Sequence, residues 1–491
     1  MLKRVFLSVL ALLLLLVAAV AVNTLRHGSR QVDVAPAPAL AVDTAAVADK
    51  LAGAIRFQTV PSQDDPAFNA GEFRKLHAFL EQRFPLVHAR LKREFVGELS
   101  LLYTWPGSEA AALPVMLMAH HDVAPIAPGT EGTWEVPPFS GQVKDGYVWG
   151  RGAWDDKGNL VAQLEAIELL LASGFQPRQT VYVFSGADEE VSGQRGARQA
   201  VKLLQERNVR LDFVIDEGLV LTEGVVPGLS RPAALIGIAE KGYTSIHLKV
   251  AAAPGHSSMP PQAGTTAVGR MLRALQRLED DQFPAQLKGV AREMFGTLAP
   301  EMGGMQRVAL SNLWLFGPLV ESQLARGTST NAMLRTTTAV TIMNAGNKEN
   351  VIPGVAEATV NFRILPGDSR AGVMEHVRTR VGEGFELKEW PGSVDPTPVT
   401  PTDSHAYRTL ERTLRSLFPD TIVAPSLYIA GSDSQHFVPI ADHIFRFSPV
   451  RAKPEDLPRL HGTNERISVA NLGELVRFYH QLLRNLSAPA P

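Results

Sequence analysis

The chain has 491 residues, which exceeds one typical domain, and its 45% hydrophobic and 20% charged residues are an ordinary globular balance. A net charge of −2 without a long basic run argues against a nucleic-acid partner. Cysteine is absent, which excludes disulfides and thiolate ligands, so any zinc ion must be held by His, Asp and Glu side chains.

The N-terminal segment is strongly apolar. Residues 5–22 are interrupted only by Ser8 and follow Lys3 and Arg4. Because about 20 apolar residues cross a bilayer, we expect a membrane anchor at 1–25, with the bulk of the chain exported to the periplasmic or lumenal side. A signal peptide cleaved near the small residues 19–21 is the alternative, and it would leave a secreted protein. Residues 26–45, with two prolines among alanines, predict a linker.

Apolar runs and amphipathic segments alternate in the next part of the chain. Strands are expected at 114–119, 181–184 and 211–215, and helices at 160–172 and 197–207. This order predicts an α/β fold, namely a doubly wound, mostly parallel sheet with helices on both faces. In such sheets the functional crevice lies beyond the carboxyl ends of the strands.

Candidate metal ligands follow all three predicted strands. They are His120, His121 and Asp122, then Asp188, Glu189 and Glu190, then Asp216 and Glu217. Three adjacent carboxylates repel one another unless a cation neutralises them. The alternative for residues 188–190 is an acidic loop favoured by the dipole of the following helix. Because three such segments converge on one edge of the sheet, the pattern favours a metal cluster.

A different pattern begins near Glu240. Residues 243–250 alternate like a half-exposed antiparallel strand, and the segments that follow predict a small α+β lid. Its further strands are expected at 336–343, 356–364 and 385–390, and its helices at 265–278 and 370–381, whereas 282–330 predict no particular order. Helices at 404–417 and 472–483 resume the α/β pattern. We therefore expect a catalytic domain in two parts, 46–238 and 396–486, around a lid at 239–395, with a frayed tail at 487–491.

Six motifs occur in the order found in one enzyme family. They are His120-x-Asp122, Gly150-Arg151-Gly152-x-x-Asp155-x-Lys157-Gly158, Asp188-Glu189-Glu190, Asp216-Glu217-Gly218, Gly255-His256-Ser257-Ser258 and His461-Gly462. The chain thereby resembles the di-zinc aminoacylase/carboxypeptidase family, which includes glutamate carboxypeptidase, aminoacylase and carnosinase, over nearly all of residues 46–485. It is most similar to the branch with yeast vacuolar carboxypeptidase S and the secreted N-fatty-acyl-amino-acid synthase/hydrolase. The resemblance implies a zinc-bearing α/β domain interrupted by a smaller lid domain.

The resemblance also implies two Zn²⁺ ions, or another divalent metal in their place. His120 and Asp216 would bind one ion, Glu190 and His461 the other, and Asp155 would bridge both. Glu189 would be the general base, and Asp122 would hold the far nitrogen of His120.

Three neighbours of these residues are expected to have other roles. Strand alternation puts His121 on the opposite face from His120, so His121 is expected to be a packed or surface imidazole. Asp156 and Glu217 are expected to cap or pair rather than bind metal. Ala187 stands where close relatives often have His, and it removes no ligand.

The lid and the final part of the chain supply the candidate substrate contacts. By resemblance, His256 would stabilise the oxyanion; in some relatives this histidine comes from a dimer partner. The alternative is that His256 is an ordinary loop histidine without a role in the site. Asn331 is a second lid candidate. Arg363 would bind the substrate carboxylate, for which a planar guanidinium is suited, and a surface ion pair is its alternative. Gly431 and His436 would bind or orient substrate, and a surface imidazole is the alternative for His436.

The expected function is that of an exported zinc amidohydrolase. It would cleave N-acyl amino acids, or the C-terminal bond of small peptides, and a homodimer through the lid is compatible with the resemblance. A dipeptidase is the alternative within enzymes. A metal-dependent peptide-binding protein is the alternative in another class, and the intact Glu189 argues against it because binding needs no general base.

Overall fold

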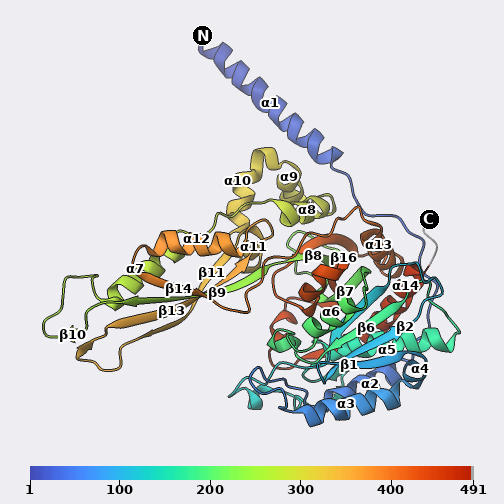
Figure 1. Cartoon of the computed structure of the whole chain (residues 1–491). Coiled ribbons are helices and arrows are strands. Elements are labelled where there is room, and N and C mark those ends of the chain that lie inside the picture. The colour runs from blue at the N-terminus through green and yellow to red at the C-terminus, as the bar shows by residue number, and fades with distance from the viewer. Residues whose placement is uncertain (488–491) are drawn as a thin grey trace.

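The computed structural model describes residues 1–487. The frayed tail expected at 487–491 therefore lies, beyond its first residue, outside the described part of the chain. The main body is built on an eight-stranded sheet with the order β1-β2-β6-β3-β7-β16-β8-β15 (Figure 1). Its strands are β1 (Lys92–Val96), β2 (Ser100–Trp105), β3 (Val115–His120), β6 (Val181–Gly186), β7 (Leu211–Thr222), β8 (Ala233–Glu240), β15 (Ile422–Tyr428) and β16 (Ala441–Ala452). A three-stranded sheet of β4 (Gln142–Lys144), β5 (Tyr147–Trp149) and β17 (Arg466–Ser468) accompanies it.

The centre of the large sheet is parallel, as the sequence predicts. β3 pairs in parallel with both β6 and β7, and β7 with β16, whereas β1 and β2 add an antiparallel edge. Alternate residues of β3 enter different cores. Val115 and Leu117 pack in one hydrophobic cluster, whereas Met116 and Met118 pack in another on the opposite face. Both faces are therefore buried, which is the doubly wound arrangement.

Helices cover the two faces unequally. The helices of this region are α2 (Thr44–Ile55), α3 (Ala70–Arg83), α4 (Pro85–Arg90), α5 (Lys157–Ala172), α6 (Ala197–Glu206), α13 (His405–Leu417) and α14 (Val469–Leu486). The larger cluster joins the sheet to α2, α5, α13 and α14, and the smaller one joins it to α6 and the 3₁₀ helix at Asp433–Ile440. The start of α14 is defined by Ser468, whose side chain accepts the backbone N–H of Asn471.

The lid is a separate antiparallel sheet with the order β11-β13-β9-β14. Its elements are β9 (Gly242–Ala251), β10 (Gly255–His256), α7 (Ala267–Asp280), β11 (Thr337–Ala345), β12 (Val351–Ile352), β13 (Val355–Ile364), α12 (Arg370–Val381) and β14 (Phe385–Glu389). Burial alternates along β9 and β13, and their buried residues pack against α7 and α12. The lid projects to one side of the main sheet, with β10 at its far end (Figure 1). The domain boundaries at 46, 239 and 396 stay predictions.

Four helices fill the stretch for which the sequence predicts no order. They are α8 (Gly289–Leu298), α9 (Gly304–Ser311), α10 (Leu313–Leu324) and α11 (Thr328–Leu334). Leu298, Val320 and Leu334 share a core with Ile422 and Ala424 of β15, so this helical insert packs on the edge of the large sheet.

The N-terminal helix α1 (Leu2–Arg26) has no buried residue and extends away from the body (Figure 1). It is the one helix in residues 1–487 that is long and apolar enough to cross a membrane. The segment after it lies on the body. Gln31 exchanges two hydrogen bonds with the backbone of Val423, donating at 2.8 Å and accepting at 2.7 Å, and the Ala37 N–H donates to the Ser416 carbonyl.

Candidate active site

The predicted ligand segments meet at one edge of the large sheet. His120 is the last residue of β3, and Glu189 and Glu190 lie in a 3₁₀ turn shortly after the end of β6. Asp155 precedes α5, and His461 lies in the loop before β17. The side chains of Asp155, Glu189, Glu190 and His461 line a single cavity.

Asp155 lies between the two candidate histidine ligands. Its Oδ1 is 2.8 Å from His120 Nε2, and its Oδ2 is 2.9 Å from His461 Nε2. Glu190 Oε1 is 3.4 Å from the same His461 nitrogen. One carboxylate oxygen thus faces each imidazole, the arrangement that a carboxylate bridging two cations requires. His120, Asp155 and Glu190 bring their ligand atoms within 4.8 Å of one another.

A second group of potential ligands shares His120. It contains Asp156 and Glu217, and Glu217 Oε1 is 3.6 Å from His120 Nε2. Both oxygens of Asp216 accept backbone N–H groups, from Glu217 at 2.9 Å and from Ser434 at 2.9 Å. The carboxylate that lies beside His120 is that of Glu217 and not that of Asp216. The ligand role predicted for Asp216 stays a prediction. Asp156 pairs with Asn159 at 2.6 Å.

Asp122 fixes the orientation of the His120 ring on the side away from the cluster. Its Nδ1 lies 2.9 Å from the Asp122 carbonyl and 3.4 Å from the Asp122 carboxylate. A proton on Nδ1 therefore leaves the Nε2 lone pair directed into the cluster. The other Asp122 oxygen accepts the Glu190 N–H at 3.0 Å, so Asp122 links two segments of the site. His121 is fully buried between His77 Nε2, at 3.1 Å, and Ser185 Oγ, at 2.8 Å, as a packed imidazole.

The cluster carries more acidic groups than the protein itself can neutralise. Burial, opposed by His120 and reinforced by nearby carboxylates, raises the pKa of Glu189 and of Glu217 well above the usual range. The neighbouring carboxylates of Asp155 and Glu190 raise the pKa of His461 to about 10. Glu190 Oε1 and Asp122 Oδ1 are buried, and each lies 3.4 Å from an imidazole nitrogen, too far for a good hydrogen bond. Divalent cations fit this set of imidazole and carboxylate donors, because they supply the missing positive charge.

A buried ion pair joins the two loops that carry Asp155 and His461. Glu465 Oε2 accepts Arg151 Nη1 at 2.6 Å, and Glu465 Oε1 accepts the N–H groups of Gly152, Trp154 and Asp155 at 2.9, 2.9 and 3.1 Å. Arg151 Nη2 in turn donates to the His461 carbonyl at 2.9 Å. We call this arrangement the Arg151–Glu465 clasp. Sequence reasoning missed it, although both residues flank predicted ligand motifs.

The cavity at the cluster measures about 1720 Å³ and has two chemically different parts. Besides the cluster, its polar lining includes Lys241, Arg326, Arg363 and Gly431. Its apolar limb lies against the helical insert and is lined by Val226, Met294, Phe295, Met302, Leu319 and Val320.

Three cationic residues, Lys241, Arg326 and Arg363, line the cavity without an ion-pair partner in residues 1–487. The Arg363 guanidinium lies 4.9 Å from the centre of the Tyr243 ring. Lys241, which sequence reasoning missed, donates to the carbonyls of Ala332 and Arg335 at 2.9 Å each. Burial, and then the Arg363 charge, lower the pKa of Lys241 to about 7. Lys241 lies between two apolar strands, β8 and β9. A lysine in such a position is the sequence signal that could have revealed this residue.

Three predicted contact residues lie elsewhere in the described chain. His256 is exposed on β10, at the far end of the lid, and its Nδ1 lies 2.8 Å from Ser258 Oγ (Figure 1). His436 bonds to the Ser192 carbonyl at 3.0 Å, and Asn331 lies on α11; neither lines the cavity. The roles predicted for these three residues stay predictions.

The chain is similar to known proteins over most of its length. The model of "Peptidase family M20/M25/M40" matches residues 116–485. An N-fatty-acyl-amino acid synthase/hydrolase of Xenopus tropicalis is 42% identical over 442 residues, covering 89% of this chain and 85% of that protein. A carboxypeptidase S-like protein of Dictyostelium discoideum is 39% identical over 444 residues, with the same two coverages.

Solved structures support the same fold at low sequence identity. An M20 family metallo-carboxypeptidase from Sulfolobus solfataricus superposes with a TM-score of 0.66 at 16% identity, covering 91% of this chain and 100% of that one. Human carnosine dipeptidase 1 superposes with a TM-score of 0.61 at 16% identity, covering 90% and 96%. The family match and the close relatives together establish that this chain belongs to peptidase family M20/M25/M40.

Proposed function

We propose that this protein is a membrane-anchored, metal-dependent amide hydrolase that releases amino acids from N-acyl amino acids with long acyl chains. The observation that carries the proposal is the cavity, which continues from the histidine–carboxylate cluster into an apolar limb. Its volume of about 1720 Å³ exceeds the ~300–1,000 Å³ of most small-ligand pockets. The 42% identity to an N-fatty-acyl-amino acid synthase/hydrolase supports the same substrate class.

Five residues would hold two divalent cations: His120, Asp155, Glu190 and His461, with Asp216 or Glu217 as the fifth. Bound divalent cations would supply Lewis-acid polarisation of the scissile carbonyl. Family membership supports metal dependence, and zinc suits a donor set of imidazoles and carboxylates.

The chain's own residues divide the remaining work. Glu189, which lines the cavity beside Glu190, would take a proton from the attacking water and return it to the leaving nitrogen. The products are then a free carboxylic acid and a free amino acid. Arg363 and Lys241 would hold the α-carboxylate of the amino-acid part, because both line the cavity and lie close enough together for the Arg363 charge to lower the pKa of Lys241. The acyl chain would occupy the apolar limb.

The α1 helix supports a membrane-anchored form, and a form secreted after cleavage is the alternative. The exposed position of His256 supports a homodimer in which the lid of one chain would reach the site of the other. Neither proposal affects the chemistry assigned to the cluster.

Acyl-chain length provides the test. Since each buried CH₂ contributes about 0.8 kcal/mol, kcat/KM of the full chain in detergent should rise by up to ~fourfold per methylene from acetyl to long-chain substrates. Ala309→Trp should fill the limb and remove the gain for long chains while sparing the acetyl substrate. Ser322→Trp, on the exposed side of α10, is the matched control. Faster cleavage of dipeptides than of any N-acyl amino acid would instead favour the dipeptidase function.

A further inference from the structure

The helical insert exposes a cluster of large apolar side chains. Met305 on α9 and Trp314, Leu315 and Leu319 on α10 are 70%, 61%, 37% and 66% exposed, and Met305 and Leu319 also line the active-site cavity. Gathered on two consecutive helices, they form an apolar patch of the kind that marks an interaction site. The patch lies at the end of the molecule from which α1 projects (Figure 1).

The last turn of α1 is attached to this insert by polar contacts. Asn23 donates to the Ser311 carbonyl at 2.5 Å, and Asn312 donates to Thr24 Oγ1 at 2.8 Å. The apolar part of α1 ends just before Asn23. At 1.5 Å per residue, a bilayer that holds α1 therefore begins within about one helical turn of α9 and α10.

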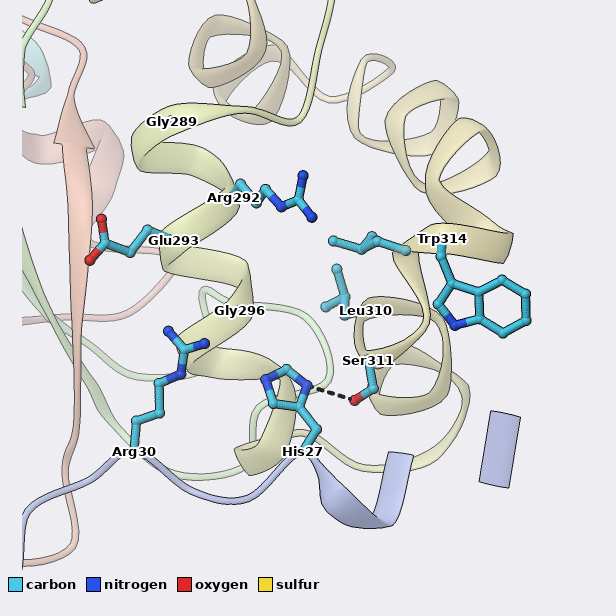
Figure 2. A pocket seen from close by; sticks show the side chains of 10 residues that line it. His27, Arg30, Gly289, Arg292, Glu293, Gly296, Leu310, Ser311 and Trp314 are labelled. Atoms are coloured by element: carbon cyan, nitrogen blue, oxygen red, sulfur yellow. Dashed lines mark hydrogen bonds between the residues drawn. The ribbon is translucent and has the colours of Figure 1, made fainter. Parts of the chain in front are cut away.

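A basic cavity of about 460 Å³ lies between the end of α1, α8 and α10. Its charged and titratable lining residues are His27, Arg30, Arg292 and Glu293, and Figure 2 shows the Glu293 side chain on the opposite side of α8 from that of Arg292. Within residues 1–487, neither arginine has an ion-pair partner. Burial, and then the charges of Arg30 and Arg307, lower the pKa of His27. The cavity therefore has an excess of positive charge and suits an anion.

We propose that this face, made of the apolar patch and the basic cavity, docks on a bilayer and binds the phosphate headgroup of an anionic phospholipid through Arg30 and Arg292. Three features of bilayers match it. Tryptophan concentrates at the membrane interface, anionic lipids attract basic residues close to the surface, and guanidinium groups form paired bonds with phosphate. The proposal rests on the membrane-anchored form proposed above and is independent of the hydrolase activity.

The position of this face also relates it to the active-site cavity. Leu310 lines both the basic cavity and the apolar limb. A docked bilayer would therefore lie next to the limb in which the acyl chain is proposed to bind.

Lipid binding to the full chain in detergent tests the headgroup site. Native mass spectrometry should detect stronger binding of phosphatidylglycerol than of phosphatidylcholine. Because each basic residue near an anionic surface contributes about fivefold, Arg30→Gln/Arg292→Gln should weaken phosphatidylglycerol binding by ~30-fold. Arg74→Gln/Arg90→Gln, which removes two exposed arginines from α3 and α4 at the other end of the molecule, should leave it unchanged. Equal losses of phosphatidylglycerol binding in the two double variants would overturn the proposal. Binding of inorganic phosphate by the same arginines, without a preference for the anionic lipid, would overturn it as well.

Tryptophan quenching tests the apolar part. In nanodiscs with brominated lipids, the full chain should lose fluorescence relative to unbrominated nanodiscs, and Trp314→Phe should remove most of that loss. Trp390→Phe, which replaces an exposed tryptophan of the lid, is the control, and this variant should show the same loss of fluorescence as the unchanged protein. The same quenching in both variants would show that α10 stays in water and would overturn bilayer docking. Cleavage of a short N-acyl substrate should persist in the Arg30 and Arg292 variant.

Discussion

The Arg151–Glu465 clasp should decide both the stability of the site and its hold on metal. Its two charged side chains are 2% and 0% exposed, so water cannot replace either partner. Arg151→Met leaves the Glu465 carboxylate with three backbone donors but without a counter-cation. Glu465→Gln keeps the acceptor for those donors and turns an amide N–H₂ toward Arg151.

The magnitude follows from the burial of the pair. Breaking a buried ion pair by removing one partner costs about 3–5 kcal/mol in the free energy of unfolding. The double variant should be about 1–3 kcal/mol more stable than the sum of the single changes predicts, because it leaves no uncompensated charge. Arg151 also donates to the His461 carbonyl, so its loss should weaken binding of the metal that His461 is proposed to hold by about 10–100-fold.

Urea unfolding of the full chain measures the first effect, and competition with a chelator measures the second. Arg178→Met provides the control, because its ion pair with Glu109 has side chains that are 35% and 50% exposed. Such a surface pair should contribute less than about 1 kcal/mol. If Arg151→Met changes stability no more than Arg178→Met and metal retention is unchanged, the reasoning about the clasp is refuted.

Three further predictions concern single side chains. Glu189→Gln should keep the metals, measured by elemental analysis, but lower turnover by at least ~10³ because the proton acceptor is lost; near-normal turnover in the metal-loaded variant would reject that role. Glu217→Gln should lower metal content more than Asp216→Asn, because Glu217 faces His120 whereas both Asp216 oxygens accept backbone N–H groups; the opposite order would restore Asp216 as the ligand. Burial, and then Arg93, lower the pKa of His77 to about 4. Between about pH 6.5 and pH 4, the unfolded state therefore binds a proton at His77 that the folded state does not bind. Stability should therefore fall by on the order of 3 kcal/mol as pH drops from about 7 to 4, and His77→Gln should flatten that slope; identical slopes in melts of both proteins would contradict it.

Local pattern was sufficient to predict the central parallel strands of the sheet and the edge at which the candidate ligands meet. A parallel strand must be buried on both faces, so 114–119 and 181–184 are continuous apolar runs, and the chain turns at the point where each run ends. Residues at or shortly after the ends of such runs, such as His120 and Glu190, are therefore brought to one edge of the sheet. The same reasoning could not order residues 282–330. Apolar side chains of the insert face its core, the active-site cavity and the surface, which obscures the helical period.

Only the tertiary structure decided which side chain of a motif faces which partner. In β7, the pairing with β16 passes from Asp216 directly to Leu219, so Glu217 and Gly218 lie in a bulge that re-aims the Glu217 carboxylate toward His120. Strand alternation read from the sequence cannot reveal such a register shift. The Arg151–Glu465 clasp joins residues 314 positions apart, and a charge acquires its partner only when folding removes both from water. The sequence by itself determined which chemical groups reach the edge of the sheet, because that depends on the period of single strands. Their pairing, orientation and burial depended on contacts between distant segments, which no local pattern encodes.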